Sequence, residues 1–217
     1  MEIELQKTFE GKDGLTLDDF DPFVEKVCAI PKILKRNLFE RIKVVEKLDE
    51  NADKLPKLCV INYWKKNFEN ESVPKRVFKL FAQPDSKYLV PDDFKSLFKN
   101  LLETHPGLEF LQATPEFQER YADTVVMRIF FSLDSNDDSK ITWRDFKNSN
   151  LMDTFFQVSS ENDINVVRQY FSYEHFYVLY CRFWELDTDH DFFIDKEDFS
   201  RYEGHALSRK AVDRIFE

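Results

Sequence analysis

Two stretches of twelve residues carry oxygen-bearing side chains at the same steps along the chain. The first runs from Asp134 to Asp145 and the second from Asp187 to Asp198. In both, side-chain oxygens occupy positions 1, 3, 5, 9 and 12, and isoleucine occupies position 8. Oxygens at this spacing, together with a backbone carbonyl at position 7, wrap around a hard divalent cation. The pattern therefore predicts two cation-binding loops and a binding function.

The loop at 187–198 is predicted to be the stronger site, because aspartate fills every side-chain ligand position. The predicted ligands are Asp187, Asp189, Asp191, the backbone carbonyl of Phe193, Asp195 and Asp198. Phe192 stands at position 6, where the sharp turn needs a positive φ and glycine is usual. Asp198 has a shorter arm than the usual glutamate. We expect this to weaken Ca²⁺ binding and to leave Mg²⁺ as a competitor.

The loop at 134–145 is predicted to be the weaker site, because fewer of its ligands are charged. Those ligands are Asp134, Asn136, Asp138, the backbone carbonyl of Lys140, Thr142 and Asp145. The alternative is a structural role, in which Ile141 pairs with Ile194 in a short ladder between the loops. An extra helix around residues 163–170 is expected to fill the long spacing between the two loops.

A short pattern recurs outside these loops: an aliphatic residue, three further residues, then Asp and Phe. Copies begin at Leu15, Leu89, Ile141 and Ile194, and a weaker copy begins at Leu55. The copies at 15, 55 and 89 lack upstream ligands. The repeat predicts an all-α fold of tandem EF-hand-like helix-loop-helix units, with short β ladders between loops. We expect degenerate units in an N-terminal helical part, residues 1–70, and both calcium loops in an EF-hand domain, residues 71–217.

Helix signals agree with this organisation. Apolar residues at helical spacing precede both loops: Val126, Ile129, Phe130 and Leu133, then Leu179, Phe183 and Leu186. Thr114 followed by Pro115 is typical of a helix start, and Ser208 could cap a last helix. Breaks in the pattern predict loops at 104–108 and 158–163. The 23 Phe residues are expected to pack amphipathic helices together.

Composition excludes several other classes of protein. A net charge of −10 disfavours nucleic acid as a partner, because phosphates need a basic surface. The three cysteines have no CxxC spacing and are expected to be reduced thiols of a cytoplasmic protein, with nuclear or cytoskeletal association as alternatives. No apolar stretch is long enough to predict a membrane span.

No constellation of catalytic residues stands out, and the chain is predicted not to be an enzyme. The four histidines form no cluster with metal-site spacing, and His190, at position 4 of its loop, is expected to face solvent. A basic cluster is either a solvated helix face or a dock for an acidic partner: Lys32, Lys35, Arg36, Arg41 and Lys43.

The run from Tyr170 to Asp191 closely resembles the B-double-prime class of regulatory subunits of protein phosphatase 2A. Further similar stretches are Thr104–Leu111, Pro115–Tyr121, His205–Leu207 and Asp213–Phe216. The segments Cys28–Pro31 and Tyr88–Val90 look most like the TONNEAU/FASS-type branch. The similarity runs from about residue 20 to the end of the sequence, and the long run is highly specific.

This resemblance implies a subunit that binds the HEAT-repeat scaffold subunit and places phosphoprotein substrates near the catalytic subunit, tuned by Ca²⁺. The family's calcium loop corresponds to the loop at 187–198, from Asp187 to Asp198. A second strong EF-hand normally follows it, so the chain is expected to be truncated before that unit. The alternative is a stand-alone calcium sensor or buffer that binds target helices. The 3 Met residues disfavour this alternative, because such grooves are usually rich in methionine.

Overall fold

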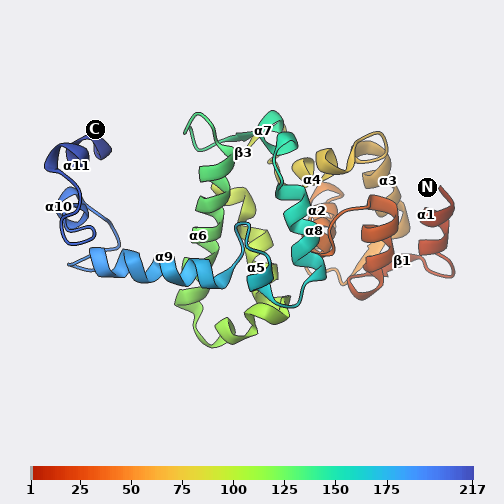
Figure 1. Ribbon diagram of the computed structural model, residues 1–217. Helices are drawn as coiled ribbons and strands as arrows, with labels where there is room; N and C mark the ends of the chain where they lie inside the picture. The colour runs from red at the N-terminus through yellow and green to blue at the C-terminus, as the bar shows by residue number, and fades with distance from the viewer. Residues whose placement is uncertain (1) are drawn as a thin grey trace. The chain divides into compact units, whose positions relative to one another are not determined.

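The computed structural model describes residues 2–217 and consists of helices joined by loops and two short ladders (Figure 1). It divides into two compact units: unit 1 ends at Phe171, and unit 2 runs from Ser172 to Glu217. The predicted all-α class with short ladders is confirmed. The residues just before and just after the domain boundary expected at residue 70 both lie in unit 1. That boundary stays a prediction.

The N-terminal part of unit 1 contains the first ladder. Its elements are α1 (Glu2–Thr8), β1 (Gly14–Thr16), α2 (Lys35–Val45), β2 (Lys54–Pro56) and α3 (Lys57–Asn67), with 3-10 turns at Asp18–Phe20 and Lys32–Leu34 and a π-helical turn at Phe23–Cys28. β1 and β2 run antiparallel, with Leu15 opposite Leu55. A Cβ atom on Gly14 would lie 2.4 Å from the Leu55 carbonyl oxygen. The two strands therefore approach closely only because Gly14 has no side chain.

The rest of unit 1 contains the second ladder. Its elements are α4 (Val73–Phe81), β3 (Tyr88–Leu89), α5 (Lys95–Thr104), α6 (Pro115–Leu133), β4 (Ile141–Thr142), α7 (Trp143–Asn148) and α8 (Leu151–Ser160), with 3-10 segments at Pro91–Phe94, Pro106–Ala113 and Ile164–Val166. β3 pairs antiparallel with β4, and Leu89 lies opposite Ile141. The predicted pairing of Ile141 with Ile194 is therefore wrong. Ile141 pairs with the neighbouring ligand-poor repeat of its own unit, whereas Ile194 belongs to unit 2 and lies outside any strand.

Two local predictions are also wrong. In place of the loop expected at 104–108, a 3-10 helix begins at Pro106, because the fixed φ of proline suits a first helical position. His105 caps this helix, since its Nδ1 accepts a hydrogen bond from the Gly107 N–H at 3.1 Å. Residues 163–170 form no extra helix beyond a single 3-10 turn, and α8 fills the spacing instead.

Phenylalanine rings form much of the core of unit 1. Phe81 of α4 stacks on Phe94 with 5.0 Å between ring centroids. Phe130 of α6 meets Phe94 edge-on at 5.9 Å. Phe98 of α5 stacks on Phe171 at 6.0 Å. The expected role of phenylalanine in packing helices together is confirmed for these residues, and offset or edge-on pairs are the favourable geometries.

A buried arginine joins the two parts of unit 1. Arg76 on α4 is only 6% exposed. Its Nε donates a hydrogen bond to the Phe68 carbonyl at 3.0 Å, and its Nη1 donates to the Cys28 carbonyl at 2.7 Å. The guanidinium also lies 4.7 Å from the centroid of Trp64. Cys28 and Phe68 lie at the C-terminal ends of helical segments, where carbonyls lack helical donors and a cation is favourable.

Unit 2 contains three helices: α9 (Tyr173–Leu186), α10 (Lys196–Ser200) and α11 (Arg209–Ile215). Ser208 caps α11 as predicted, because its hydroxyl oxygen accepts from the Ala211 N–H at 3.3 Å. Phe199 of α10 meets Phe216 edge-on at 5.8 Å, and Lys196 forms an ion pair with Asp213. These contacts hold α10 and α11 together. Within residues 2–217, no helix is both long and apolar enough to cross a membrane.

Candidate metal centre

The loop at 187–198 begins with a fully buried aspartate. Asp187 follows α9 directly, its N–H donates to the Phe183 carbonyl at 2.9 Å, and the residue is 0% exposed. Its Oδ2 accepts a hydrogen bond from the Phe192 N–H at 2.9 Å. Its Oδ1 is buried without any hydrogen-bond partner. A buried carboxylate oxygen without a partner is costly, and a cation at this point would satisfy it.

Three carboxylates converge at the same place. Oxygens of Asp187, Asp189 and Asp191 all lie within 4.8 Å of one another. Among the described residues this is the one group of three or more His, Cys, Asp or Glu side chains with metal-site geometry. Negative charges at this distance repel each other, and a divalent cation would remove that repulsion. The hard oxygen ligands fit Ca²⁺ or Mg²⁺.

The backbone of this loop turns in the way the ligand pattern requires. His190 and Phe192 both have positive φ, at 58° and 67°. The positive φ predicted at Phe192 is therefore confirmed, although a residue with a Cβ atom adopts it at a cost of about 1–2 kcal/mol. The turn directs the Phe193 N–H to Asp191 Oδ1 at 2.8 Å.

The end of the loop is a reciprocal helix cap. The Asp198 N–H donates to Asp195 Oδ1 at 2.8 Å, and the Asp195 N–H lies 3.4 Å from Asp198 Oδ2. The other oxygen, Asp198 Oδ1, accepts from the Thr188 hydroxyl at 2.7 Å and lies 3.4 Å from Arg201 Nη1. The hydrogen bond from Thr188 lowers the pKa of the Asp198 carboxyl below its usual value.

Sequence reasoning missed Thr188 and Arg201. Arg201 follows Asp198 by three residues at the end of α10, a spacing at which helical side chains are neighbours. That spacing is the signal that could have identified it. Thr188 has no comparable signal, because it faces Asp198 only after the loop has closed.

His190 is exposed, as expected for position 4 of the loop. Its ring nevertheless stacks on Trp184 of α9, with 4.0 Å between centroids and 8° between planes. His190 therefore packs the loop against the helix that precedes it.

The loop at 134–145 repeats the same hydrogen bonds. The Ser139 N–H donates to Asp134 Oδ2 at 2.7 Å, and the Lys140 N–H donates to Asp138 Oδ1 at 3.1 Å. Asp137 and Ser139 have positive φ, at 55° and 58°, at the same positions as in the other loop. Asp134 Oδ1 is also buried without a hydrogen-bond partner. The backbone framework for a cation is thus present twice.

The two loops differ in charge. Lys140 Nζ lies 3.7 Å from Asp138 Oδ2, so a protein cation already faces one predicted ligand of the first loop. Asn136 occupies position 3, where the second loop has Asp189. The weaker electrostatic attraction agrees with the predicted ranking, which itself stays a prediction.

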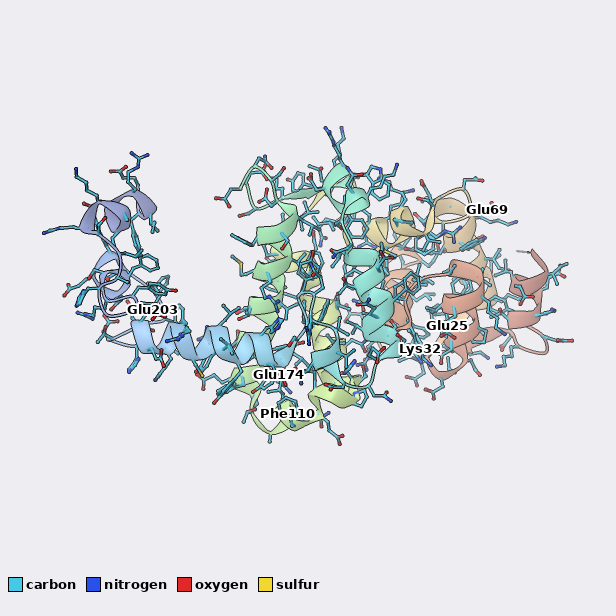
Figure 2. The ribbon with its side chains drawn as sticks, in the orientation of Figure 1. Glu25, Lys32, Glu69, Phe110, Glu174 and Glu203 are labelled. Atoms are coloured by element: carbon cyan, nitrogen blue, oxygen red, sulfur yellow. The ribbon has the colours of Figure 1, made fainter. Side chains whose placement is uncertain are left out.

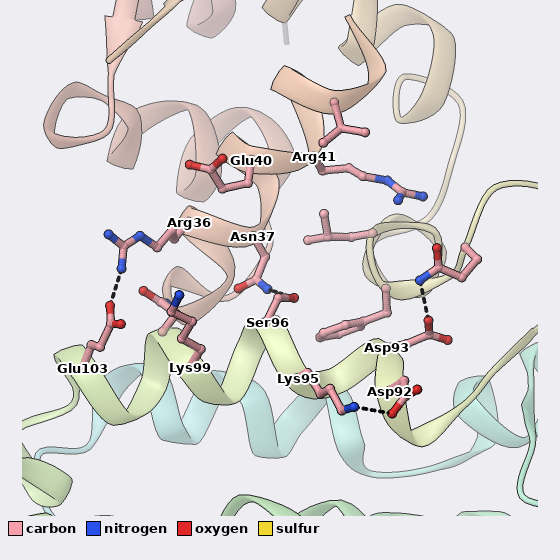
Figure 3. A pocket seen from close by; sticks show the side chains of 15 residues that line it. Arg36, Asn37, Glu40, Arg41, Asp92, Asp93, Lys95, Ser96, Lys99 and Glu103 are labelled. Atoms are coloured by element: carbon pink, nitrogen blue, oxygen red, sulfur yellow. Dashed lines mark hydrogen bonds and ion pairs between the residues drawn. The ribbon is translucent and has the colours of Figure 1, made fainter. Parts of the chain in front are cut away.

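Four of the five cations of the basic cluster on and before α2 have an acidic partner within unit 1, and the fifth, Arg41, donates to the Ala82 carbonyl at 2.7 Å. Lys32 and Lys35 each lie 2.8 Å from Asp21, and Lys43 pairs with Glu40 at 3.1 Å. Figure 3 shows the ion pair between Arg36 and Glu103 and the hydrogen bond from Asn37 to Ser96, which join α2 to α5. These contacts favour a helix face over a dock for an acidic partner. All three cysteines are free thiols, as predicted.

Comparison with known proteins identifies the family. A family model described as an EF-hand domain matches residues 73–161. The chain is 46% identical over 215 residues to a protein of Arabidopsis thaliana named as the probable B''delta regulatory subunit of serine/threonine protein phosphatase 2A. This match covers 98% of the chain but 39% of the plant protein. The human B'' alpha regulatory subunit of the same phosphatase is 39% identical over 89% of the chain and 16% of its own length.

A solved structure shares both sequence and fold with the chain. It is described as a PP2A PR70 holoenzyme and marked "diCa", and the matching chain is 44% identical with a TM-score of 0.65. The match covers 67% of this chain and 55% of that chain. The relatives are named as regulatory subunits of the phosphatase. The chain therefore belongs to the B'' family of protein phosphatase 2A regulatory subunits.

Proposed function

We propose that the chain is a calcium-binding part of a phosphatase 2A regulatory subunit that binds the scaffold subunit and directs the catalytic subunit to phosphoprotein substrates. Family membership supports the regulatory role. The observation that carries the metal-binding role is Asp187, which is fully buried with one oxygen left without a partner among converging carboxylates. The chain spans less than half the length of its plant relative, so partners and substrates belong to the proposal.

In this proposal the stronger site is formed by Asp187, Asp189, Asp191, the Phe193 carbonyl, Asp195 and Asp198. The weaker site is formed by Asp134, Asn136, Asp138, the Lys140 carbonyl, Thr142 and Asp145. Bound Ca²⁺ would supply positive charge to each loop. The residues of the stronger loop would then hold the end of α9 and the start of α10 in one geometry. Mg²⁺ is the expected competitor, because aspartate at position 12 gives less advantage to Ca²⁺.

The proposed action is non-enzymatic and takes place in the cytoplasm. The chain is expected to position other subunits, so hydrolysis of phosphoproteins depends on the catalytic subunit. A calcium-dependent change in the geometry of α9 and α10 would alter the surface that these helices offer to a partner.

The test is a binding assay between the purified chain and the purified scaffold subunit, performed in Ca²⁺ and in chelator. The variant Asp187→Ala/Asp189→Ala removes two ligands of the stronger site and serves as the reference without that site. We expect Ca²⁺ to strengthen scaffold binding and to raise the melting temperature of the wild-type chain. A ligand at a hundredfold excess over its Kd stabilises the folded state by about 2.7 kcal/mol.

The two halves of the proposal can fail separately. Scaffold affinity that is equal in Ca²⁺ and in chelator, while the melting temperature shifts, would mean that the metal is only structural. Absence of scaffold binding in both conditions would contradict the regulatory role of this part of the chain. A melting temperature that does not change when Ca²⁺ is added would contradict the metal-binding role.

A further inference from the structure

The carboxylate at position 12 is held differently in the two loops. In the stronger loop, Asp198 Oδ1 accepts from the Thr188 hydroxyl at 2.7 Å and lies 3.4 Å from Arg201 Nη1. Arg201 Nη1 also donates to the Thr188 hydroxyl oxygen, and Arg201 Nη2 donates to Glu197 at 3.1 Å. Asp198, Thr188 and Arg201 therefore form a closed set of contacts, called here the Arg201 latch.

The weaker loop lacks such a latch. Its position 12 is Asp145, and the residues equivalent to Thr188 and Arg201 are Ser135 and Asn148. Asp145 Oδ2 accepts from the Thr142 N–H at 3.0 Å and from the Thr142 hydroxyl. Neither Ser135 nor Asn148 is hydrogen-bonded to Asp145 in the part of the chain that the structure describes. The latch is thus a specific feature of the stronger loop.

The latch affects the relative affinities of the loop for Ca²⁺ and Mg²⁺. Ca²⁺ accepts six to eight oxygens and commonly takes both oxygens of the carboxylate at position 12, whereas Mg²⁺ requires six ligands in near-octahedral geometry. Oδ1 of Asp198 is engaged by the side chains of Thr188 and Arg201, whereas Oδ2 has only the long contact with the Asp195 N–H at 3.4 Å and is the oxygen available to a metal ion. The positive charge of Arg201 also opposes the arrival of a divalent cation.

We propose that the Arg201 latch limits Asp198 to one metal-binding oxygen and thereby lowers the preference of this loop for Ca²⁺ over Mg²⁺. This inference rests on the proposed metal-binding function of the loop. It assigns Thr188 and Arg201, which are not ligands, as the residues that set cation selectivity.

The test uses the full chain with Asp134→Ala, so that only the loop at 187–198 titrates. Arg201→Gln and Thr188→Val are introduced separately, and Ca²⁺ and Mg²⁺ affinities are measured by calorimetric titration. Arg182→Gln is the matched control, because Arg182 is an exposed cation of unit 2 outside the latch. It lies 2.9 Å from Glu185 and 3.6 Å from Glu203, which is labelled in Figure 2.

We expect both latch variants to raise the ratio of Ca²⁺ to Mg²⁺ affinity by about threefold to tenfold, because each removes one of the two side-chain partners of Asp198 Oδ1 and makes this oxygen easier for Ca²⁺ to take. Arg201→Gln should also strengthen binding of both ions by up to about tenfold through loss of its charge. The control should leave the ratio unchanged. The hydroxyl removed in Thr188→Val is neutral, so a changed ratio in this variant cannot come from charge.

An unchanged ratio in both latch variants would overturn the inference. Weaker Ca²⁺ binding in both latch variants would also overturn the inference, because it would mean that Thr188 and Arg201 hold Asp198 in the orientation that binds Ca²⁺. Adding Asp187→Ala to the Asp134→Ala chain gives the reference without either site. If this reference binds Ca²⁺ and Mg²⁺ as the Asp134→Ala chain does, the loop at 187–198 is not the metal site. The proposed metal-binding function of the loop is then contradicted, and the inference that rests on it is contradicted too.

Discussion

Replacing Arg76 by methionine tests how much a single buried cation contributes to unit 1. Methionine keeps a flexible apolar stem and removes the guanidinium. The change removes two hydrogen bonds from a charged donor, to the carbonyls of Cys28 and Phe68, each worth about 1.5–3 kcal/mol. It also removes the contact with Trp64, worth about 0.5–2 kcal/mol. Relief of the cost of burying the charge offsets part of this loss, leaving a net destabilisation of about 3–5 kcal/mol.

The assay is equilibrium unfolding in urea, monitored by circular dichroism, with chelator present so that bound metal does not contribute. Lys79→Met is the matched control on the same helix. Lys79 pairs with Glu71 at 2.6 Å, but its side chain is 37% exposed, so its loss should cost only about 0–1 kcal/mol. If Arg76→Met lowers the free energy of unfolding no more than Lys79→Met does, the argument that Arg76 holds two helix ends together is refuted.

Three further predictions concern the metal loops, catalysis and pH. Asp187→Ala should abolish the tighter of the calorimetric Ca²⁺ binding events and Asp134→Ala should affect it less; the reverse order would contradict the ranking of the loops. The purified chain alone should not hydrolyse phosphoprotein, and turnover that follows this chain through purification without a catalytic subunit would contradict a regulatory role. Burial lowers the pKa of His105 in the folded state, so protonation of this imidazole favours the unfolded chain. The contribution of neutral His105 to the free energy of unfolding should be fully present above the unfolded pKa of about 6.5 and should decrease as pH drops below it. His105→Gln should flatten this part of the curve of melting temperature against pH, and identical curves for the two proteins would contradict the assignment.

Patterns that depend on neighbouring residues could be predicted from the sequence. The start of α6 at Pro115, the cap at Ser208 and the positive φ at Phe192 are local consequences of residue type and spacing. The shared hydrogen bonds of the two metal loops follow from the same repeated pattern. These features need no knowledge of which helices pack together.

Ladder partners could not be predicted in the same way. Leu15, Leu55, Leu89, Ile141 and Ile194 occupy equivalent positions in their repeats, so the pattern does not distinguish one partner from another. Packing within unit 1 decides the pairs, and these are Leu15 with Leu55 and Leu89 with Ile141. The Arg201 latch could not be predicted for a similar reason: Thr188 contacts Asp198 only when the loop folds back on itself.

The stack of His190 on Trp184 gives the chain an optical reporter of its own. Indole emission depends on the groups that contact the ring, and His190 lies between two predicted metal ligands. Any tightening of the loop should therefore change the emission of Trp184. The other tryptophans are well separated in the sequence: Trp143 follows the ladder residues of the first metal loop, and Trp64 is buried beside Arg76. Variants that keep one tryptophan each would let fluorescence follow the stronger loop, the weaker loop and the N-terminal core separately, without any attached dye.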